Sequence, residues 1–318
     1  MNKSAPKPGK EKTEINDSRL QNIWIVTLLA NICCALWGSA IPCIKTGYAW
    51  LDISRTSDQI VFAGLRFTLA GIQLFALYPL LYHRVCRLKK GMYSKAFGLG
   101  MAQTFLQYFF FYIGMANVTG VKGSIITAAN SFFVIVLAHF FIRGEQLNLK
   151  KAVGCLLGLA GVIAVNWGGD FSGGMSLTGE GFLLIAGFSY GVAQLLSKKL
   201  VRDENPVAII CYNFLFGGVS LLAVGFLMGG TIPHFTAGSL LLLFYMGVIS
   251  AGAFTIWTLL LKYNQVSRIS MFNFMTPVYG CLFSALILGE SFWRPEVLAA
   301  LALVCAGILV VNHKAPGL

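Results

Sequence analysis

The chain has few charged residues, and this scarcity excludes most soluble folds. Charged residues make up 11% of its 318 residues, whereas hydrophobic residues make up 57%. Apolar runs of roughly 20 residues recur from Ile23 to Val311, and each is long enough to cross a bilayer core of about 30 Å. A soluble domain could not bury that much apolar surface. We therefore expect an all-α integral membrane protein.

The sequence also lacks several common signatures of enzymes and metal sites. It contains neither the His-Glu-x-x-His motif nor the phosphate-binding Gly-x-x-x-x-Gly-Lys-Ser/Thr loop. Its eight cysteines are scattered without a Cys-x-x-Cys pair, so they are interpreted as small apolar residues. We therefore expect no enzymatic activity, no cofactor, no metal and no direct drive by ATP.

Turn-forming residues divide the apolar runs into ten predicted transmembrane helices. Long linkers are absent, and residues 1–20 form a polar segment that we expect to be a disordered cytoplasmic tail. The predicted helices cover residues 23–46, 57–82, 94–116, 119–142, 149–167, 179–198, 206–229, 238–261, 267–288 and 296–312.

The distribution of basic residues predicts the orientation. If the N-terminus is cytoplasmic, 19 of the 24 Lys and Arg residues fall in cytoplasmic segments and 4 fall outside. The positive-inside rule then places both termini in the cytoplasm and requires an even number of spans. The net charge of +12 is thus a topology signal, and we expect no nucleic-acid partner. A multi-pass protein of a bacterial inner membrane is expected.

The two halves of the chain share landmarks in the same order. Trp37 precedes a glycine and is followed eight residues later by Lys45; Tyr190 precedes a glycine and is followed eight residues later by Lys198. The next helix reads Leu-Arg-Phe at 65–67 in the first half.

Further matches extend the repeat along both halves. Residues 212–214 read Tyr-Asn-Phe, at the place of Leu-Arg-Phe in the first half. The fourth and ninth helices both end in Gly-Glu, at Glu145 and Glu290, and the fifth and tenth end in Asn166 and Asn312. Five helices per copy is an odd number, so the second copy must be inverted in the membrane. We expect two inverted five-helix repeats, at 21–167 and 168–314.

These residues resemble the EamA branch of the drug/metabolite transporter superfamily over about residues 23–312. The resemblance implies ten helices, a central cavity and movement of small metabolites, often export of amino acids. One departure concerns the fourth helix, where this chain has Asn130-Ser131-Phe132 in place of the usual proline. The ninth helix keeps Pro277. The fourth helix is therefore expected to be straighter.

Arg66 is the sharpest candidate for a functional residue, because a charge inside a span is costly and normally faces the bundle interior. It could clamp a carboxylate or phosphate of the solute. It could equally be a structural pin to backbone carbonyls or to an acid such as Asp58. Both roles remain open.

Three further residues are candidates for proton coupling or gating. Glu145 and Glu290 lie at helix ends, where they could carry a proton, latch helices together or cap the following helix. His139 lies within a span and could switch its charge near neutral pH, or could be a hydrogen-bonded core residue.

Acids are absent from the central third of every predicted span. This disfavours cationic cargo, which antiporters commonly hold on a buried carboxylate. Neutral, zwitterionic or anionic cargo, or facilitated diffusion, is favoured.

Amides and aromatic rings supply the other polar groups at membrane depth, either as a cavity lining or as ordinary links between helices. Besides Arg66, the predicted lining comprises Trp37, Gln103, Gln107, Asn130, Tyr190, Gln194, Asn213, Trp257, Asn273 and Tyr279. Gln103 and Gln107 are expected on one helix face.

The leading functional prediction is a secondary transporter that exports a small metabolite, with amino acids preferred, by alternating access. Its partners would be the solute and membrane lipid, and the chain would be a monomer or a homodimer. An integral membrane enzyme acting on a lipid-linked substrate, or a non-transporting partner subunit, are the alternatives.

Overall fold

The computed structural model describes residues 19–118, 120–165, 176–288 and 295–312, and every regular element in these ranges is helical. In the first half these elements are η1 (Arg19–Gln21), α1 (Ile23–Trp50), α2 (Thr56–Tyr82), α3 (Met92–Gly100), η2 (Met101–Leu106), α4 (Gln107–Ala116), α5 (Gly120–Phe141) and α6 (Leu149–Val165). In the second half they are η3 (Leu177–Gly181), α7 (Phe182–Leu200), α8 (Pro206–Leu227), α9 (Ala237–Tyr263), α10 (Val266–Ser270), η4 (Met271–Phe274), α11 (Met275–Leu288) and α12 (Pro295–Asn312).

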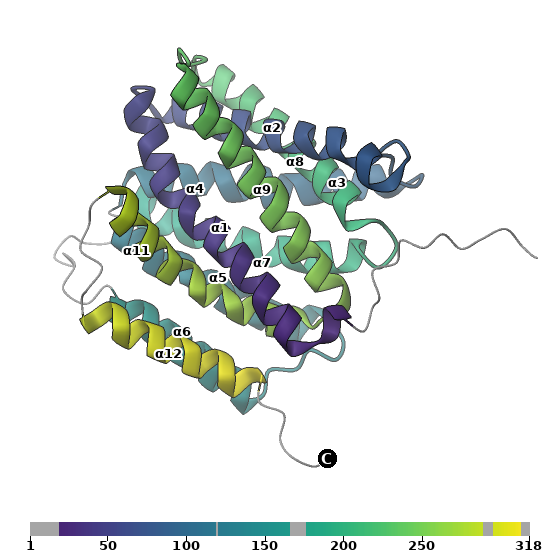
Figure 1. The fold of residues 1–318 in the computed structure, drawn as a ribbon, viewed down its shortest axis with the longest axis vertical. Helices are drawn as coiled ribbons and strands as arrows, with labels where there is room; N and C mark the ends of the chain where they lie inside the picture. The colour runs from purple at the N-terminus through teal and green to yellow at the C-terminus, as the bar shows by residue number, and fades with distance from the viewer. Residues whose placement is uncertain (1–18, 119, 166–175, 289–294, 313–318) are drawn as a thin grey trace, which may run out of the picture.

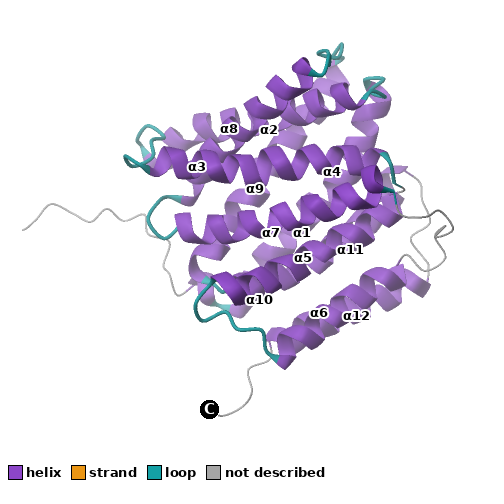
Figure 2. Ribbon diagram, turned by 180° about the vertical axis from the view of Figure 1, so that it is seen from behind, coloured by secondary structure: helices purple, strands orange, loops and turns teal. Residues whose placement is uncertain are grey.

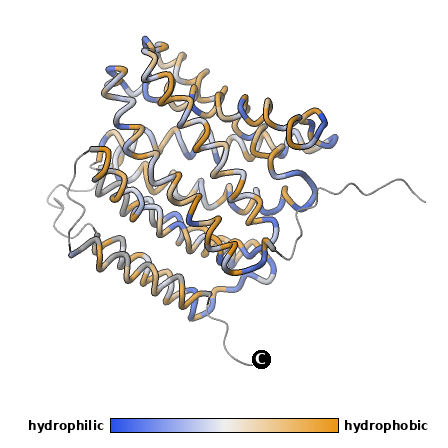
Figure 3. The backbone as a smooth tube through the Cα atoms, in the orientation of Figure 1, coloured by the Kyte–Doolittle hydropathy of each residue, from blue (hydrophilic) through white to orange (hydrophobic). Residues whose placement is uncertain are grey.

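Several of the helices are long and apolar enough to span a membrane. Five of the described segments are by themselves long and apolar enough to cross a bilayer: α1, α2, η3 with α7, α8 and α9. Figure 3 shows hydrophobic residues along the helices and hydrophilic ones at their ends and in the connections. The prediction of an all-α membrane protein is confirmed, while the predicted tail falls largely outside the described residues.

Two predicted spans each contain a turn of a helix type other than α. The third consists of α3, the π-helical turn η2 and α4, and the ninth consists of α10, the 3₁₀ turn η4 and α11. By contrast α5 is an uninterrupted α-helix, as expected for a fourth span without proline. The first span runs to Trp50, which places Lys45 within the helix.

Helices α2 and α8 form an antiparallel seam between the two halves (Figures 1 and 2). Its glycines let the backbones approach. A Cβ atom on Gly64 would lie 2.7 Å from the backbone nitrogen of Leu222, and one on Gly218 would lie 2.5 Å from that of Thr68. The contacts move up one helix as they move down the other, so the two helices run in opposite directions.

Helices α6 and α12 form a second antiparallel seam at the other end of the bundle (Figure 1). Gly154 approaches Val311 and Gly307, and Gly158 approaches Gly307 and Phe274. The glycine pair of the predicted fifth span thus packs within the chain. Both seams join a helix of the first half to the helix at the same place in the order of the second half, as the predicted inverted repeat would require.

The remaining helices fill the space between the seams in matching pairs. Helix α1 packs against α9 and α11, and its counterpart α7 packs against α4 and α5. Gly38 of α1 lies against Tyr279, and Gly191 of α7 lies against Phe133 and Leu137. The interior between α1 and α7 is therefore bounded by helices of both halves.

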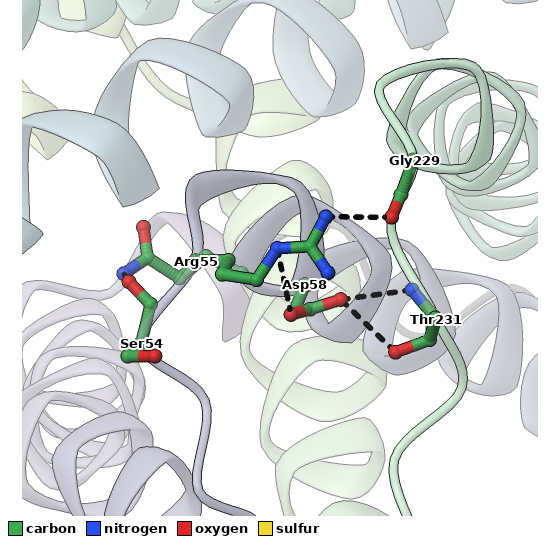
Figure 4. A network of polar contacts seen from close by, with 6 residues as sticks. Ser54, Arg55, Asp58, Gly229 and Thr231 are labelled. Atoms are coloured by element: carbon green, nitrogen blue, oxygen red, sulfur yellow. Dashed lines mark hydrogen bonds and ion pairs between the residues drawn. The ribbon is translucent and has the colours of Figure 1, made fainter.

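Polar clamps hold the α2–α8 seam at both ends. Figure 4 shows the clamp at the start of α2, where Asp58 accepts hydrogen bonds from the Thr231 backbone N–H (2.8 Å) and hydroxyl (3.2 Å). Arg55 donates to the Gly229 carbonyl at 3.0 Å. At the start of α8, Glu204 accepts from the Lys89 backbone N–H at 2.9 Å. Each clamp ties the start of one helix to the loop that follows its counterpart.

Candidate functional site

A cavity of about 110 Å³ lies between the two halves; we call it the central cavity. Its wall combines aliphatic, aromatic and polar side chains from both repeats. The lining residues are Trp37, Ala40, Ile41, Ile44, Arg66, Gln107, Tyr108, Phe111, Thr127, Asn130, Ala186, Tyr190, Phe254, Asn273, Thr276 and Pro277. Six of the predicted lining residues meet here: Trp37, Arg66, Gln107, Asn130, Tyr190 and Asn273.

Arg66 supplies a charge to this wall, and only 1% of its surface is exposed. Its Nε donates to Ser250 Oγ at 2.9 Å and its Nη1 to Tyr112 Oη at 3.3 Å, and the guanidinium lies 5.1 Å from the Phe67 ring centre. Within the described ranges no carboxylate lies within 4 Å of it, and Asp58 instead binds Thr231. Of the alternatives left open for Arg66, a pin to Asp58 is therefore not the one that the structure has.

Three of the five N–H donors of Arg66 make no hydrogen bond to any described residue. A buried guanidinium without a counter-charge is costly unless its donors find an acceptor. Since the side chain lies on the cavity wall, an anionic group inside the cavity would supply that acceptor.

Other polar atoms on the wall are also unpaired within the described part of the chain. Trp37 Nε1, Gln107 Oε1 and Asn130 Oδ1 are buried and make no hydrogen bond there. Thr276 Oγ1 on the same wall is likewise unpaired. Most buried polar groups in folded proteins are paired, so four unpaired ones around one cavity indicate a place for a polar ligand or water. The set offers both a donor and acceptors.

Aromatic rings form the apolar part of the wall. Trp37 lies 5.2 Å from Phe254 between ring centres, and Tyr108 lies 5.8 Å from Phe111 and 6.5 Å from Phe254. Tyr190 accepts a hydrogen bond from Asn273 Nδ2 at 2.8 Å. The cavity therefore has a rigid apolar wall in addition to its polar groups.

Gln103 and Asn213 lie outside this wall, in the contact between η2 and α8. Asn213 Nδ2 donates to Gln103 Oε1 at 2.5 Å, and Thr104 Oγ1 donates to Asn213 Oδ1 at 2.8 Å. Of Gln103 and Gln107, only Gln107 lines the central cavity, and their predicted position on one helix face stays a prediction.

Three further predicted lining residues also lie away from the cavity. Trp257 Nε1 donates to Gln194 Oε1 at 3.0 Å, and the Trp257 ring supports Trp37 from behind, with the ring centres 4.9 Å apart. Tyr279 donates to Asn31 Oδ1 at 3.0 Å between α11 and α1.

The two described candidates for coupling or gating, His139 and Glu145, also lie away from the wall. His139 is exposed, and its Nδ1 accepts a hydrogen bond from the Leu147 N–H at 3.0 Å. Glu145 is buried and accepts from the N–H groups of Val266 (2.5 Å) and Ser267 (2.8 Å). Glu290 lies outside the described residues.

Glu145 therefore caps α10 and not the following helix α6, which was one of the roles left open for it. Asn148 already caps α6, accepting from the Lys151 N–H at 2.9 Å. The carboxylate joins the end of α5 to the start of the ninth span, and so links the two halves.

Residues 187–191 match the Gly-x-Ser-x-Gly pattern of some hydrolases, but their setting differs. They lie within α7, whereas a nucleophile of that class sits on a strand-to-helix turn. Ser189 Oγ donates to the Ala102 carbonyl at 2.7 Å. The pattern is part of a packed helix.

A second cavity, of about 240 Å³, continues from the central cavity; we call it the entrance cavity. The two share Ile41, Ile44 and Phe111, and the entrance cavity extends to Lys45 near the end of α1. At the other face, where α1 begins, hydrogen bonds from Trp257 to Gln194 and from Lys198 to the end of α9 join the helices. The site thus opens away from the face at which α1 begins.

The two halves of the chain each match one family model, the EamA-like transporter family, over residues 24–167 and 177–313. The chain belongs to the EamA-like transporter family. The resemblance inferred from sequence is confirmed, and this EamA chain is a membrane-embedded transporter-family protein built from two copies of one unit.

Two curated relatives span nearly the whole EamA chain. The uncharacterized transporter YoaV of Bacillus subtilis is 27% identical over 277 residues, covering 83% of this chain and 91% of that protein. A probable amino-acid metabolite efflux pump of Salmonella typhimurium is 24% identical over 295 residues, covering 89% and 93%. A solved crystal structure matches with a TM-score of 0.75 over 90% of this chain and 96% of that chain, at 17% identity, and so supports the fold.

Proposed function

We propose that this EamA chain is a secondary transporter that exports small neutral or zwitterionic metabolites, of the amino-acid class, by alternating access. The face at which α1 begins is cytoplasmic in this proposal, as the excess of Lys and Arg on that side favours. The membrane is the bacterial inner membrane. The structure then corresponds to a state open to the outside.

The observation that carries the proposal is Arg66, a buried cation on the wall of the central cavity with three N–H donors unused by described residues. A solute carboxylate would receive a forked pair of charge-assisted hydrogen bonds there. The acceptor oxygens of Gln107 and Asn130 suit the ammonium group of the same solute, because they are unpaired on the same wall.

The lining disfavours cationic cargo. Among the described lining residues there is no Asp or Glu, and Arg66 would repel a cation. The efflux pump of Salmonella typhimurium named above supports the amino-acid class.

The test is counterflow in proteoliposomes with a mixed pool of amino acids and related metabolites, read by mass spectrometry. We expect a few related solutes that carry a carboxylate to accumulate in vesicles with the protein and not in protein-free vesicles. Accumulation of cationic solutes alone would contradict the proposal. Absence of any accumulation by folded protein would favour a partner-subunit function.

A further inference from the structure

Lys45 and Lys198 occupy equivalent positions in the two repeats. Each follows the aromatic residue of its helix, Trp37 or Tyr190, by eight residues. Both aromatic residues line the central cavity. The two lysines lie near the last turns of α1 and α7, which end at opposite faces of an inverted repeat.

Lys198 joins α7 to the end of α9 at the closed face. Its Nζ donates to the carbonyls of Leu261 and Asn264, at 2.5 Å each. The last carbonyls of a helix lack intrahelical partners and lie at the negative end of the helix dipole. A lysine is therefore a favourable partner for them, and here it holds two helices of the closed face together.

At the other face, Lys45 does not form the equivalent contact with the described residues. Lys45 is exposed and makes no hydrogen bond or ion pair with any residue in the described ranges. It lines the entrance cavity together with Met115 and Val118, at the end of α4.

The repeat makes Met115 and Val118 the equivalents of Leu261 and Asn264. Ser250 binds Arg66 and Thr104 binds Asn213, at matching positions of the two halves. The number of residues that separates Thr104 from Ser250 also separates Met115 from Leu261, and Val118 from Asn264. Lys45 and the carbonyls that it would bind therefore lie on the wall of one cavity.

We propose that Lys198 and Lys45 are alternating latches that close the two faces in turn. In the present state Lys198 binds the end of α9 and the entrance cavity is open. In the opposite state Lys198 releases α9, and Lys45 binds the carbonyls at Met115 and Val118 and closes the entrance cavity. The inference rests on the proposed alternating access and assigns the residues that balance its two states.

Two latches of the same chemistry make the two states similar in free energy. A transporter needs this balance, because a state that is much more stable than the other would slow the cycle. Removing one latch should therefore shift the population toward the state that uses the other.

The experiment is hydrogen–deuterium exchange of the full chain in lipid nanodiscs without solute, followed at residues 112–118 and 258–268. In Lys198→Met we expect severalfold faster exchange at 258–268 and severalfold slower exchange at 112–118. The control is Lys199→Met, since Lys199 is exposed and makes no hydrogen bond to described residues; it should change neither segment.

The double variant Lys45→Met/Lys198→Met provides the decisive comparison. It lacks both latches, so exchange in both segments should return toward the wild-type values. If Lys198→Met does not fold, Lys45→Met alone at its exposed position should slow exchange at 258–268.

The proposal of alternating latches would be overturned if Lys198→Met exchanged faster at 258–268 without any change at 112–118. It would also be overturned if the rates in the double variant did not return toward the wild-type values. An unchanged rate at 258–268 in Lys45→Met would do the same. Because exchange is measured without solute, this failure is distinct from failure of the transport proposal, which the counterflow assay decides.

Discussion

Arg66 and Asn213 are equivalent residues with different chemistry. Each lies in the second helix of its repeat, and each binds a hydroxyl of the opposite repeat, Ser250 or Thr104. The asparagine is enclosed by Gln103 and Thr104, whereas the arginine keeps donors toward the cavity. The site is therefore asymmetric although its scaffold is symmetric.

Two substitutions of Arg66 distinguish the contribution of its positive charge to solute binding from that of its forked N–H donors. Arg66→Lys keeps the charge but loses the fork, and Arg66→Gln loses both. We expect affinity for a carboxylate-bearing solute to fall roughly tenfold in the first and about a hundredfold in the second, since charge-assisted hydrogen bonds contribute about 1.5–3 kcal/mol. Binding of the amidated solute should fall less. Equal losses for acid and amide would contradict a carboxylate at Arg66.

Gln107 and Gln103 form a matched pair for testing the wall. Gln107→Leu removes an unpaired buried oxygen, so we expect weaker solute binding with an unchanged or slightly higher melting temperature. Gln103→Leu leaves the Asn213 donor unpaired and should cost about 1–3 kcal/mol of stability, with solute affinity unchanged. Thermal unfolding and competition for counterflow measure the two effects. The reverse pattern would place the solute beside Gln103.

The sequence shows which residues within the predicted spans are polar, but it does not show which of them form hydrogen bonds with one another. Gln194 accepts a hydrogen bond from Trp257, while Gln107 Oε1 is unpaired on the wall, although both are glutamines within predicted spans. Ile41, Ile44 and Phe254 on the wall have no polar signal at all. Such residues become identifiable only when the packing of helices distant in sequence is known.

At the scale of helices, the glycines of the α2–α8 seam determine how closely the two halves approach. Gly218→Ala would place a Cβ atom 2.5 Å from the Thr68 backbone nitrogen, where only backbone movement could relieve the contact. We expect a loss of about 1–3 kcal/mol of stability. Gly252→Ala is the control, because no atom lies within 4 Å of its added Cβ and alanine favours the helix. Thermal unfolding in detergent checks both, and equal melting temperatures would contradict a tight seam.

Helix positions follow from hydrophobic runs and turn residues, but their internal irregularities do not. The π turn at Met101–Leu106 and the 3₁₀ turn at Met271–Phe274 lie in apolar stretches with no break in hydropathy. Both depend on contacts with helices of the other half, which composition does not encode. Gln103, within the π turn, binds Asn213, whereas Gln107, directly after the turn, lies on the cavity wall.

For the whole molecule, the described lining of the central cavity contains no group that titrates near neutral pH. Arginine stays protonated in proteins. We therefore expect counterflow to change less than about twofold between pH 6 and pH 8, and a pH gradient to add no accumulation beyond equilibrium. Proteoliposomes with matched and unmatched internal pH measure this. A strong dependence on the gradient would require a proton site outside the described lining.

The ten-span plan follows from the sequence because the bilayer imposes a fixed length and the inverted repeat imposes a fixed order. The central cavity, its opening toward Lys45 and its closure at Lys198 do not follow in the same way. Under the proposed alternating access they belong to one of two arrangements that a single amino-acid sequence would have to encode.

The two glycine seams also bear on the origin of the chain. In each seam a helix meets its own counterpart, α2 with α8 and α6 with α12. A five-helix ancestor that inserted in both orientations would have formed the same two seams between separate copies. Fusion of two such copies would free each from serving both orientations, and a difference such as that between Arg66 and Asn213 could then arise.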